Sequence, residues 1–162
     1  MAIMKTSQTG IDLIQSFEGC FLQAYDDYDD KVLRPGEACR GTLTIGFGHT
    51  DAAGPPSVSI GMTITKDAAL EILADDLAPV EKEVMDKVHV DLNQNQFDAL
   101  VSFQYNTGWL GHSSCSLLRH LNEGNYAAAA QSFMLYDEAS GRVLTGLKRR
   151  RQAEKNLFET PA

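Results

Sequence analysis

The sequence predicts an α+β fold in which a small β-sheet and a larger group of helices are segregated. Three observations predict it. Residues 8–23 have apolar side chains at helical spacing. Residues 25–62 are rich in glycine and proline and contain the strand-like segment TLTIGF. Apolar side chains at helical spacing return from Thr65 onward. We therefore expect a single domain over residues 1–162, with a helix and β lobe at about 8–62 and a helical lobe at about 63–160.

The first predicted helix is amphipathic. Thr9 can cap it, and Ile11, Ile14 and Phe17 repeat every three residues, which is typical of a face that packs on a core. The glycine-rich region that follows, with its loosely alternating TLTIGF segment, is expected to form a small sheet with long loops.

The second half has the marks of several helices. Leucines and valines form one stripe after Thr65, and Pro79 within that stripe should kink or split the helix. Asn93, with Gln96 three residues later, matches a capping box at the start of the next helix. Shorter helices are expected near 114–122 and 125–134, and a last one from about 147 to 158.

The composition is that of an ordinary globular protein, with 43% hydrophobic and 22% charged residues. No apolar run is long enough for a membrane helix or for a signal peptide, so we expect neither membrane insertion nor an export signal. The net charge of −8 lies entirely in residues 1–81, which hold 5 basic and 13 acidic residues. Such acidity argues against nucleic acid binding, which requires basic patches.

Cysteine and histidine show no metal-binding pattern. The three cysteines are Cys20, Cys39 and Cys115. An odd number argues against a complete disulfide framework. A bond between Cys20 and Cys39 is one alternative, but we expect the cysteines to be buried free thiols. The four histidines lack the HxH or HExxH spacing of a metal site, and we expect neither a metal nor a cofactor.

Two groups of carboxylates offer chemistry. Glu18 follows apolar residues at the end of the first predicted helix, where desolvation and the helix dipole favour the protonated acid. The segment AYDDYDD at 24–30 supplies four aspartates on a polar loop, where a carboxylate stays ionised. Glycoside hydrolysis uses such a pair: one carboxylic acid that stays protonated in an apolar environment and one carboxylate that stays ionised in a solvated environment. Local context alone, however, favours a surface Glu18 at a frayed helix end over a catalytic one.

Four segments in this order give the chain its resemblance to a known family. They are LIQSFEG at 13–19, AYDD followed by TIGFGHT at 44–50, QFDALVSFQYNTG at 96–108, and GRVLTGLKRRRQAEKNLF at 141–158. Together they resemble the phage-type lysozymes, which tailed phages use as endolysins. The resemblance covers almost the whole chain and implies a lysozyme-like fold, with a cleft between the β lobe and the helical lobe.

The resemblance also assigns roles to residues. It implies that Glu18 is the catalytic glutamate and that Asp27, nine residues later, is the catalytic aspartate. Thr44, at the start of TIGFGHT, would orient the attacking water together with Asp27. Asp26 occupies a variable position of the motif, and Asp29 and Asp30 lie beyond it. These three are expected to be solvated loop carboxylates.

Other residues are implied as supporting or substrate-binding. His49, Phe103 and Gln104 are candidates to line the saccharide site. Apart from the resemblance, we expect Trp109 to be a core residue or a turn anchor, with sugar stacking as the alternative. Arg150 is the candidate for the family's C-terminal arginine that pairs with the catalytic glutamate, with Arg151 as the alternate; Glu154 is the i,i+4 neighbour of Arg150.

The chain departs from the family pattern at two loops and in its charge. Asp27 and Thr44 are 17 residues apart, and the additional residues, about 28–41, should form a longer hairpin or loop. The segment DAAGPPSVSIG lengthens the same lobe. Many relatives are basic, which suits an anionic cell wall, whereas this chain is acidic.

The function implied is that of an endolysin muramidase. Such an enzyme hydrolyses the β-1,4 bond between N-acetylmuramic acid and N-acetylglucosamine in peptidoglycan, with inversion as the leading mechanism by analogy. The alternatives are a lytic transglycosylase and a non-catalytic wall-binding phage component. We expect a monomer that is made in the host cytoplasm and reaches the wall through a holin, which leads to host lysis.

Overall fold

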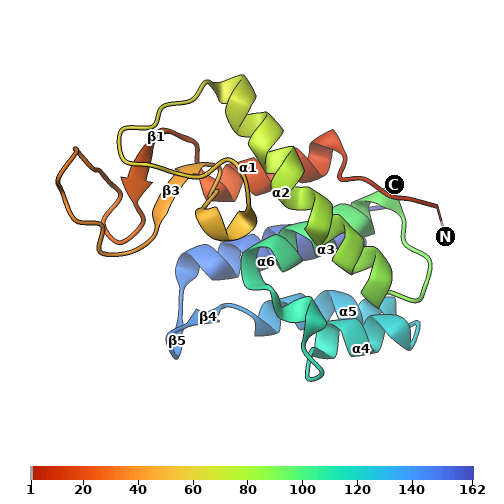
Figure 1. Cartoon of the computed structure of the whole chain (residues 1–162). Coiled ribbons are helices and arrows are strands. Elements are labelled where there is room, and N and C mark those ends of the chain that lie inside the picture. Colours follow the sequence, from red (N-terminus) through yellow and green to blue (C-terminus); the bar gives the residue numbers. More distant parts are fainter. Residues whose placement is uncertain (1) are drawn as a thin grey trace. The chain divides into compact units, whose positions relative to one another are not determined.

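The computed structural model describes residues 2–162, which form two compact units. One unit comprises residues 15–78 and the other residues 2–14 together with 79–162. Six α-helices and two small antiparallel sheets are present in the described chain (Figure 1). This is the α+β class that the sequence predicts.

The unit of residues 15–78 is built around a three-stranded antiparallel sheet of order β2-β1-β3. The strands are β1 (Phe21–Asp26), β2 (Lys31–Val32) and β3 (Leu43–Gly46), and a 3-10 turn follows at Asp51–Ala53. Ala24, Ile45 and Val58 form the buried core of this sheet, and Leu43, Met62 and Ile64 pack against it. The loop after β1 projects away from the strands (orange, at the left of Figure 1).

The first helix is shorter than the sequence predicts. Helix α1 spans Gln8–Glu18, not 8–23, and Thr9 lies inside it instead of capping it. Gly19 adopts a left-handed conformation with φ 68°, which ends the helix, and β1 begins at Phe21. The shorter helix leaves Glu18 as its last residue, directly before the sheet.

The sequence predicts that Pro79 kinks or splits its helix. Helix α2 (Lys66–Lys87) continues through Pro79, so the helix is not split. A proline inside a helix removes one hydrogen bond and costs about 3 kcal/mol. The apolar stripe that includes Leu73, Leu77 and Val84 is almost completely buried. Burial of that stripe offsets the lost bond, and the helix continues.

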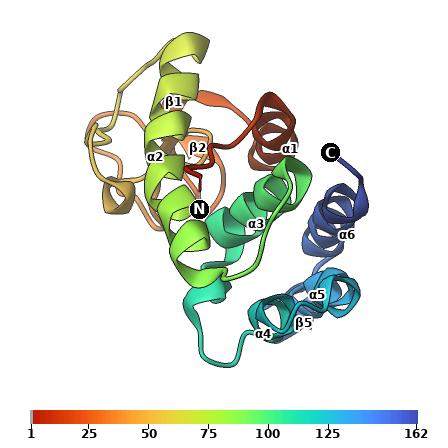
Figure 2. The ribbon, with the colours of Figure 1, turned by 90° about the vertical axis from the view of Figure 1, so that its right-hand side faces the viewer.

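The other unit packs its helices around α3 (Gln94–Thr107), which is buried from Phe97 to Gln104. Asn93 and Gln96 form the predicted capping box at its start, with N–H···O distances of 2.8 and 2.9 Å. Helix α3 packs on α6 (Thr145–Glu159), and α4 (Ser116–Asn122) packs on α5 (Tyr126–Ser132), as Figure 2 also shows.

Short elements complete this unit. Trp109–Gly111 and Phe133–Leu135 are 3-10 turns, and β4 (Glu138–Ala139) pairs with β5 (Arg142–Val143) in a two-stranded hairpin.

Candidate active site

The register of the β1–β3 hairpin places Asp27 and Thr44 on the same face. Tyr25 pairs with Thr44 and Asp26 with Leu43. The ladder continues one step further, because the backbone N–H of Asp27 donates to the Thr42 carbonyl at 3.2 Å. Opposed side chains share a face and successive ones alternate, so Asp27 and Thr44 are diagonal neighbours, and Asp26 points to the other side.

The residues added between Asp27 and Thr44 therefore leave the hairpin intact. The longer hairpin expected for 28–41 is present, since β2 pairs antiparallel with β1. The chain then returns to the end of β1. There the Thr42 backbone N–H donates to Asp27 Oδ1 at 2.6 Å, which orients this exposed carboxylate.

Glu18 lies near the same group of side chains. It is half-buried at the end of α1. Tyr25 is 7% exposed, and its pKa is raised, first by burial and then by the negative charges of Asp30, Asp27 and Glu18. These carboxylates are therefore close enough to act on one phenol. The ring of Phe21 stacks on that of Tyr25, with centroids 4.0 Å apart.

Asp26 is not a solvated loop residue, contrary to the sequence-based expectation. Its side chain is 1% exposed and accepts backbone N–H groups from Tyr28 (3.0 Å), Arg40 (2.6 Å) and Gly41 (2.9 Å). The hydrogen bonds from Arg40 and Tyr28 lower its pKa, and this outweighs the opposite effect of burial. Asp26 thus ties both ends of the added loop to β1. Asp29 and Asp30 are exposed, as expected.

Gly41 leaves the space that the two aspartates need. A Cβ at this position would lie 2.2 Å from Asp27 Oδ1 and 2.9 Å from Asp26 Oδ1. Only a residue without a side chain allows the loop to return this close to both carboxylates.

His49 is buried and hydrogen-bonded, and its backbone bridges to that of Ile45 in β3. Its Nδ1 lies 2.8 Å from Asp76 Oδ2 and its Nε2 lies 2.8 Å from the Pro56 carbonyl oxygen. Burial lowers the pKa of His49, but the Pro56 carbonyl and Asp76 outweigh it, and the net shift is upward. Both ring nitrogens face acceptors, which favours the imidazolium. At 1% exposure, His49 can support the lobe but offers almost no surface to a saccharide.

Phe103 and Gln104 are also buried, in the helical unit. Phe103 is fully buried, with edge contacts to Phe133 and Tyr136. The amide of Gln104 is used at both ends: it donates to Glu83 at 2.7 Å and accepts from the Leu110 N–H at 2.8 Å. Of the two roles expected for these residues, burial favours support over substrate contact.

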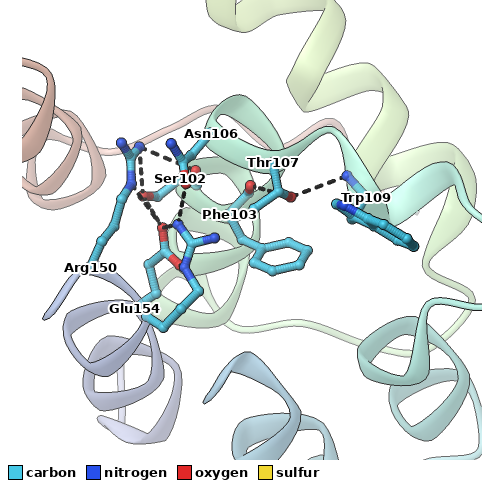
Figure 3. Close-up of polar contacts among 8 residues, drawn as sticks. Ser102, Phe103, Asn106, Thr107, Trp109, Arg150 and Glu154 are labelled. Carbon is cyan, nitrogen blue, oxygen red and sulfur yellow. Dashed lines mark hydrogen bonds and ion pairs between the residues drawn. The ribbon is translucent and has the colours of Figure 1, made fainter. Parts of the chain in front are cut away.

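Arg150 belongs to a buried charge network that sequence reasoning identified only in part. Arg150 Nε lies 3.2 Å from Glu154 Oε1, the i,i+4 contact expected, and Arg151 Nε lies 2.8 Å from Glu154 Oε2. Ser102 donates to Glu154 at 2.7 Å. Burial raises the pKa of Glu154, while Arg151 and Arg150 act in the opposite direction. Figure 3 shows Arg150, Glu154 and Ser102 directed at one another.

Arg151 is predicted only as the alternate to Arg150 for the arginine that pairs with the catalytic glutamate. It is fully buried, donates to Asn106 at 2.6 Å, and lies over the Phe103 ring at 5.2 Å. The available signal was that Glu154 is four residues after Arg150 and three after Arg151, so that its carboxylate can contact both guanidinium groups from one helix.

Trp109 lies at the surface, with 39% of its area exposed. It stacks on His112 at 4.2 Å, and its backbone N–H donates to the Thr107 hydroxyl at 3.1 Å. It borders a hollow of about 530 Å³ lined by Asn106, Thr107, Leu135, Tyr136, Glu138, Ala139 and Leu147. Trp109 is therefore a turn residue with one accessible face.

The cysteines are free, and the expectation that all three are buried is wrong for two. Cys115 is buried, but Cys20 and Cys39 are exposed and not bonded to each other. Partial desolvation of the Cys39 thiol by its surroundings and the charge of Asp26 raise the pKa of this otherwise exposed group. Within residues 2–162, histidine, cysteine and carboxylate side chains form no group of three that could hold a metal ion. No helix in this range is long and apolar enough to cross a bilayer.

The comparisons with known proteins agree on one family. The family model described as "Phage lysozyme" matches residues 15–154. The endolysin of Salmonella phage P22 is 40% identical over 156 residues, which cover 96% of this chain and 99% of that protein. The endolysin of Bacillus phage B103 is 39% identical over 157 residues, which cover 97% of this chain. The chain spans about half the length of the Bacillus phage relatives, with 55% of the B103 protein covered.

Solved structures give the same result. A crystal structure of a P22 lysozyme mutant matches with a TM-score of 0.81 and 39% identity, over 97% of this chain and 99% of that one. The muramidase domain of SpmX from Asticaccaulis excentricus matches with a TM-score of 0.79 and 39% identity, over the same fractions. Together with the matched family model, these similarities lead to one conclusion: the chain belongs to the phage lysozyme family.

Proposed function

We propose that the protein is a muramidase that hydrolyses the β-1,4 bond between N-acetylmuramic acid and N-acetylglucosamine in peptidoglycan. The observation that carries the proposal is the hairpin register, which sets Asp27 beside Thr44 on one face while Glu18 and Asp27 both act on the Tyr25 phenol. A similar protein of 39% identity is described as a muramidase domain.

In the proposed mechanism, half-buried Glu18 donates a proton to the leaving oxygen. Asp27, exposed and held by the Thr42 N–H at 2.6 Å, activates or positions water and stabilises oxocarbenium charge. Thr44 assists with the water: its hydroxyl donates to the Thr42 carbonyl at 3.0 Å, which leaves its oxygen to accept a hydrogen bond from a water molecule at the 4% of the residue that is exposed. Inversion is the expected outcome when room for that water exists between the two carboxylates.

Purified protein should release reducing sugar from murein, and Glu18→Gln and Asp27→Asn should each lower the rate by about 10²–10⁴-fold, as expected for loss of an acid or base. Asp29→Asn is the matched control, since Asp29 is an exposed aspartate of the same segment. It should retain nearly full activity with at most a shifted pH profile. A Glu18→Gln variant as active as the wild type would refute the assignment.

Two alternatives are separated by the products. A lytic transglycosylase yields anhydro-muramoyl ends, which mass spectrometry detects, and their appearance would exclude hydrolysis. A wall-binding phage component would bind murein without releasing any sugar.

The biological role we propose is host lysis by a monomer that a holin-type pore releases. Cells that express the chain in the cytoplasm should lyse only after their inner membrane is permeabilised. Lysis without permeabilisation would contradict this route.

A further inference from the structure

The added loop carries a cation on an aromatic ring beside the candidate catalytic aspartate. The guanidinium carbon of Arg40 lies 5.8 Å from the centroid of the Tyr28 ring. This is within the range of about 6 Å for cation–π attraction. Tyr28 directly follows Asp27 in the chain and is 68% exposed. The pair therefore lies at the surface next to Asp27.

One buried side chain holds both members of the pair. Asp26 Oδ1 accepts the Tyr28 backbone N–H at 3.0 Å, and Asp26 Oδ2 accepts that of Arg40 at 2.6 Å. Bonds to an ionised group are among the stronger hydrogen bonds. The two residues thus start from fixed backbone positions, although the loop between them is long.

The charge of Arg40 lacks an anionic partner within residues 2–162. Lys31, in the same loop, pairs with Glu37 at 2.9 Å, whereas the guanidinium of Arg40 contacts only the Tyr28 ring. Arg40 also borders a hollow of about 280 Å³ on the loop. An exposed, oriented guanidinium without a carboxylate is suited to bind one from a ligand, because its planar donors match carboxylate geometry.

We propose that Arg40 binds a carboxylate of the peptide attached to the muramic acid of the substrate, and that Tyr28 is a positioning residue for Arg40. The inference rests on the proposed muramidase function. The 28–41 loop would then serve substrate selection, because the oriented Arg40 guanidinium favours peptide-bearing glycan although the surrounding lobe has a strongly negative net charge.

The experiment compares two forms of one substrate: soluble peptide-bearing murein oligomers, and the same oligomers after their carboxylates are converted to amides. Wild type should show a KM about tenfold higher on the amidated form, with similar kcat; tenfold corresponds to about 1.4 kcal/mol. Arg40→Gln should raise the KM for the unmodified form and abolish the difference between the two forms.

Three further variants test the assignment. Arg34→Gln removes the same charge from the same loop and should discriminate like wild type. Tyr28→Ala should lose discrimination, with no further loss in the double variant with Arg40→Gln, and Tyr28→Phe should restore it. Retained discrimination in Arg40→Gln, or equal loss in Arg34→Gln, would overturn the inference. A wild type that cleaves neither form would overturn the muramidase proposal as well, and that result is visible without any variant.

Discussion

Replacement of Gly41 by alanine should lower activity much more than stability. The new Cβ would lie 2.2 Å from Asp27 Oδ1, whereas ordinary contact begins at 3.4 Å. The two atoms must therefore move apart by roughly 1.2 Å. Gly41 has no positive φ that alanine would strain, so the effect is steric.

The carboxylate of Asp27 yields most easily, since it is the end of an exposed side chain. The buried carboxylate of Asp26, with Oδ1 2.9 Å from the new Cβ, must also shift, by about 0.5 Å. Movement of the Asp27 carboxylate breaks the 2.6 Å bond from the Thr42 N–H, which is worth at most about 1.5–3 kcal/mol. In a domain of this size that lowers Tm by at most about 3–12 °C. A displacement of about 1 Å at a catalytic group, however, can lower the rate about 10²-fold.

We therefore expect Gly41→Ala to reduce kcat about 100-fold in a reducing-sugar assay, while differential scanning fluorimetry shows a modest fall in Tm. Gly146→Ala is the matched control, because a Cβ there meets nothing within 4 Å. It should leave both quantities unchanged or raise Tm slightly. If Gly41→Ala kept more than about a third of the wild-type rate, the position of the Asp27 carboxylate would not be critical and the reasoning would fail.

Two further predictions concern buried charges. The raised pKa of His49 means that its imidazolium stabilises the fold below the unfolded value of 6.5 and that this contribution is lost as the pH rises through the folded pKa. The wild-type Tm should thus fall as the pH rises through the neutral range, and His49→Asn should flatten that dependence; an equal slope in both would refute it. Glu154→Gln leaves Arg151 buried without a carboxylate and should cost about 3–5 kcal/mol in urea unfolding. The pair of Lys155 with Glu159, whose glutamate is exposed, is the control, and Glu159→Gln should cost below about 1 kcal/mol; equal costs would contradict the burial argument.

Local chemistry made several elements predictable from the sequence. The capping box at Asn93 and the helices after Thr65 depend on side chains only a few residues apart, and these formed as expected. The end of α1 was missed because apolar spacing continues to Phe21. The left-handed turn at Gly19 ends the helix, although the apolar pattern does not change there.

The sequence by itself determined the fold class, the family and the set of acids from which the site is drawn, because motif order and hydrophobic period are properties of the chain. The motif distinguished Asp27 from Asp26, but the sequence did not show that the Asp26 side chain is buried. Only the antiparallel register with Leu43 and Thr42 turned one inward, onto three backbone N–H groups, and the other outward. Likewise, the pairing of Arg40 with Tyr28 depends on a loop that returns to its own starting strand, and the tertiary structure alone decides where such a loop closes.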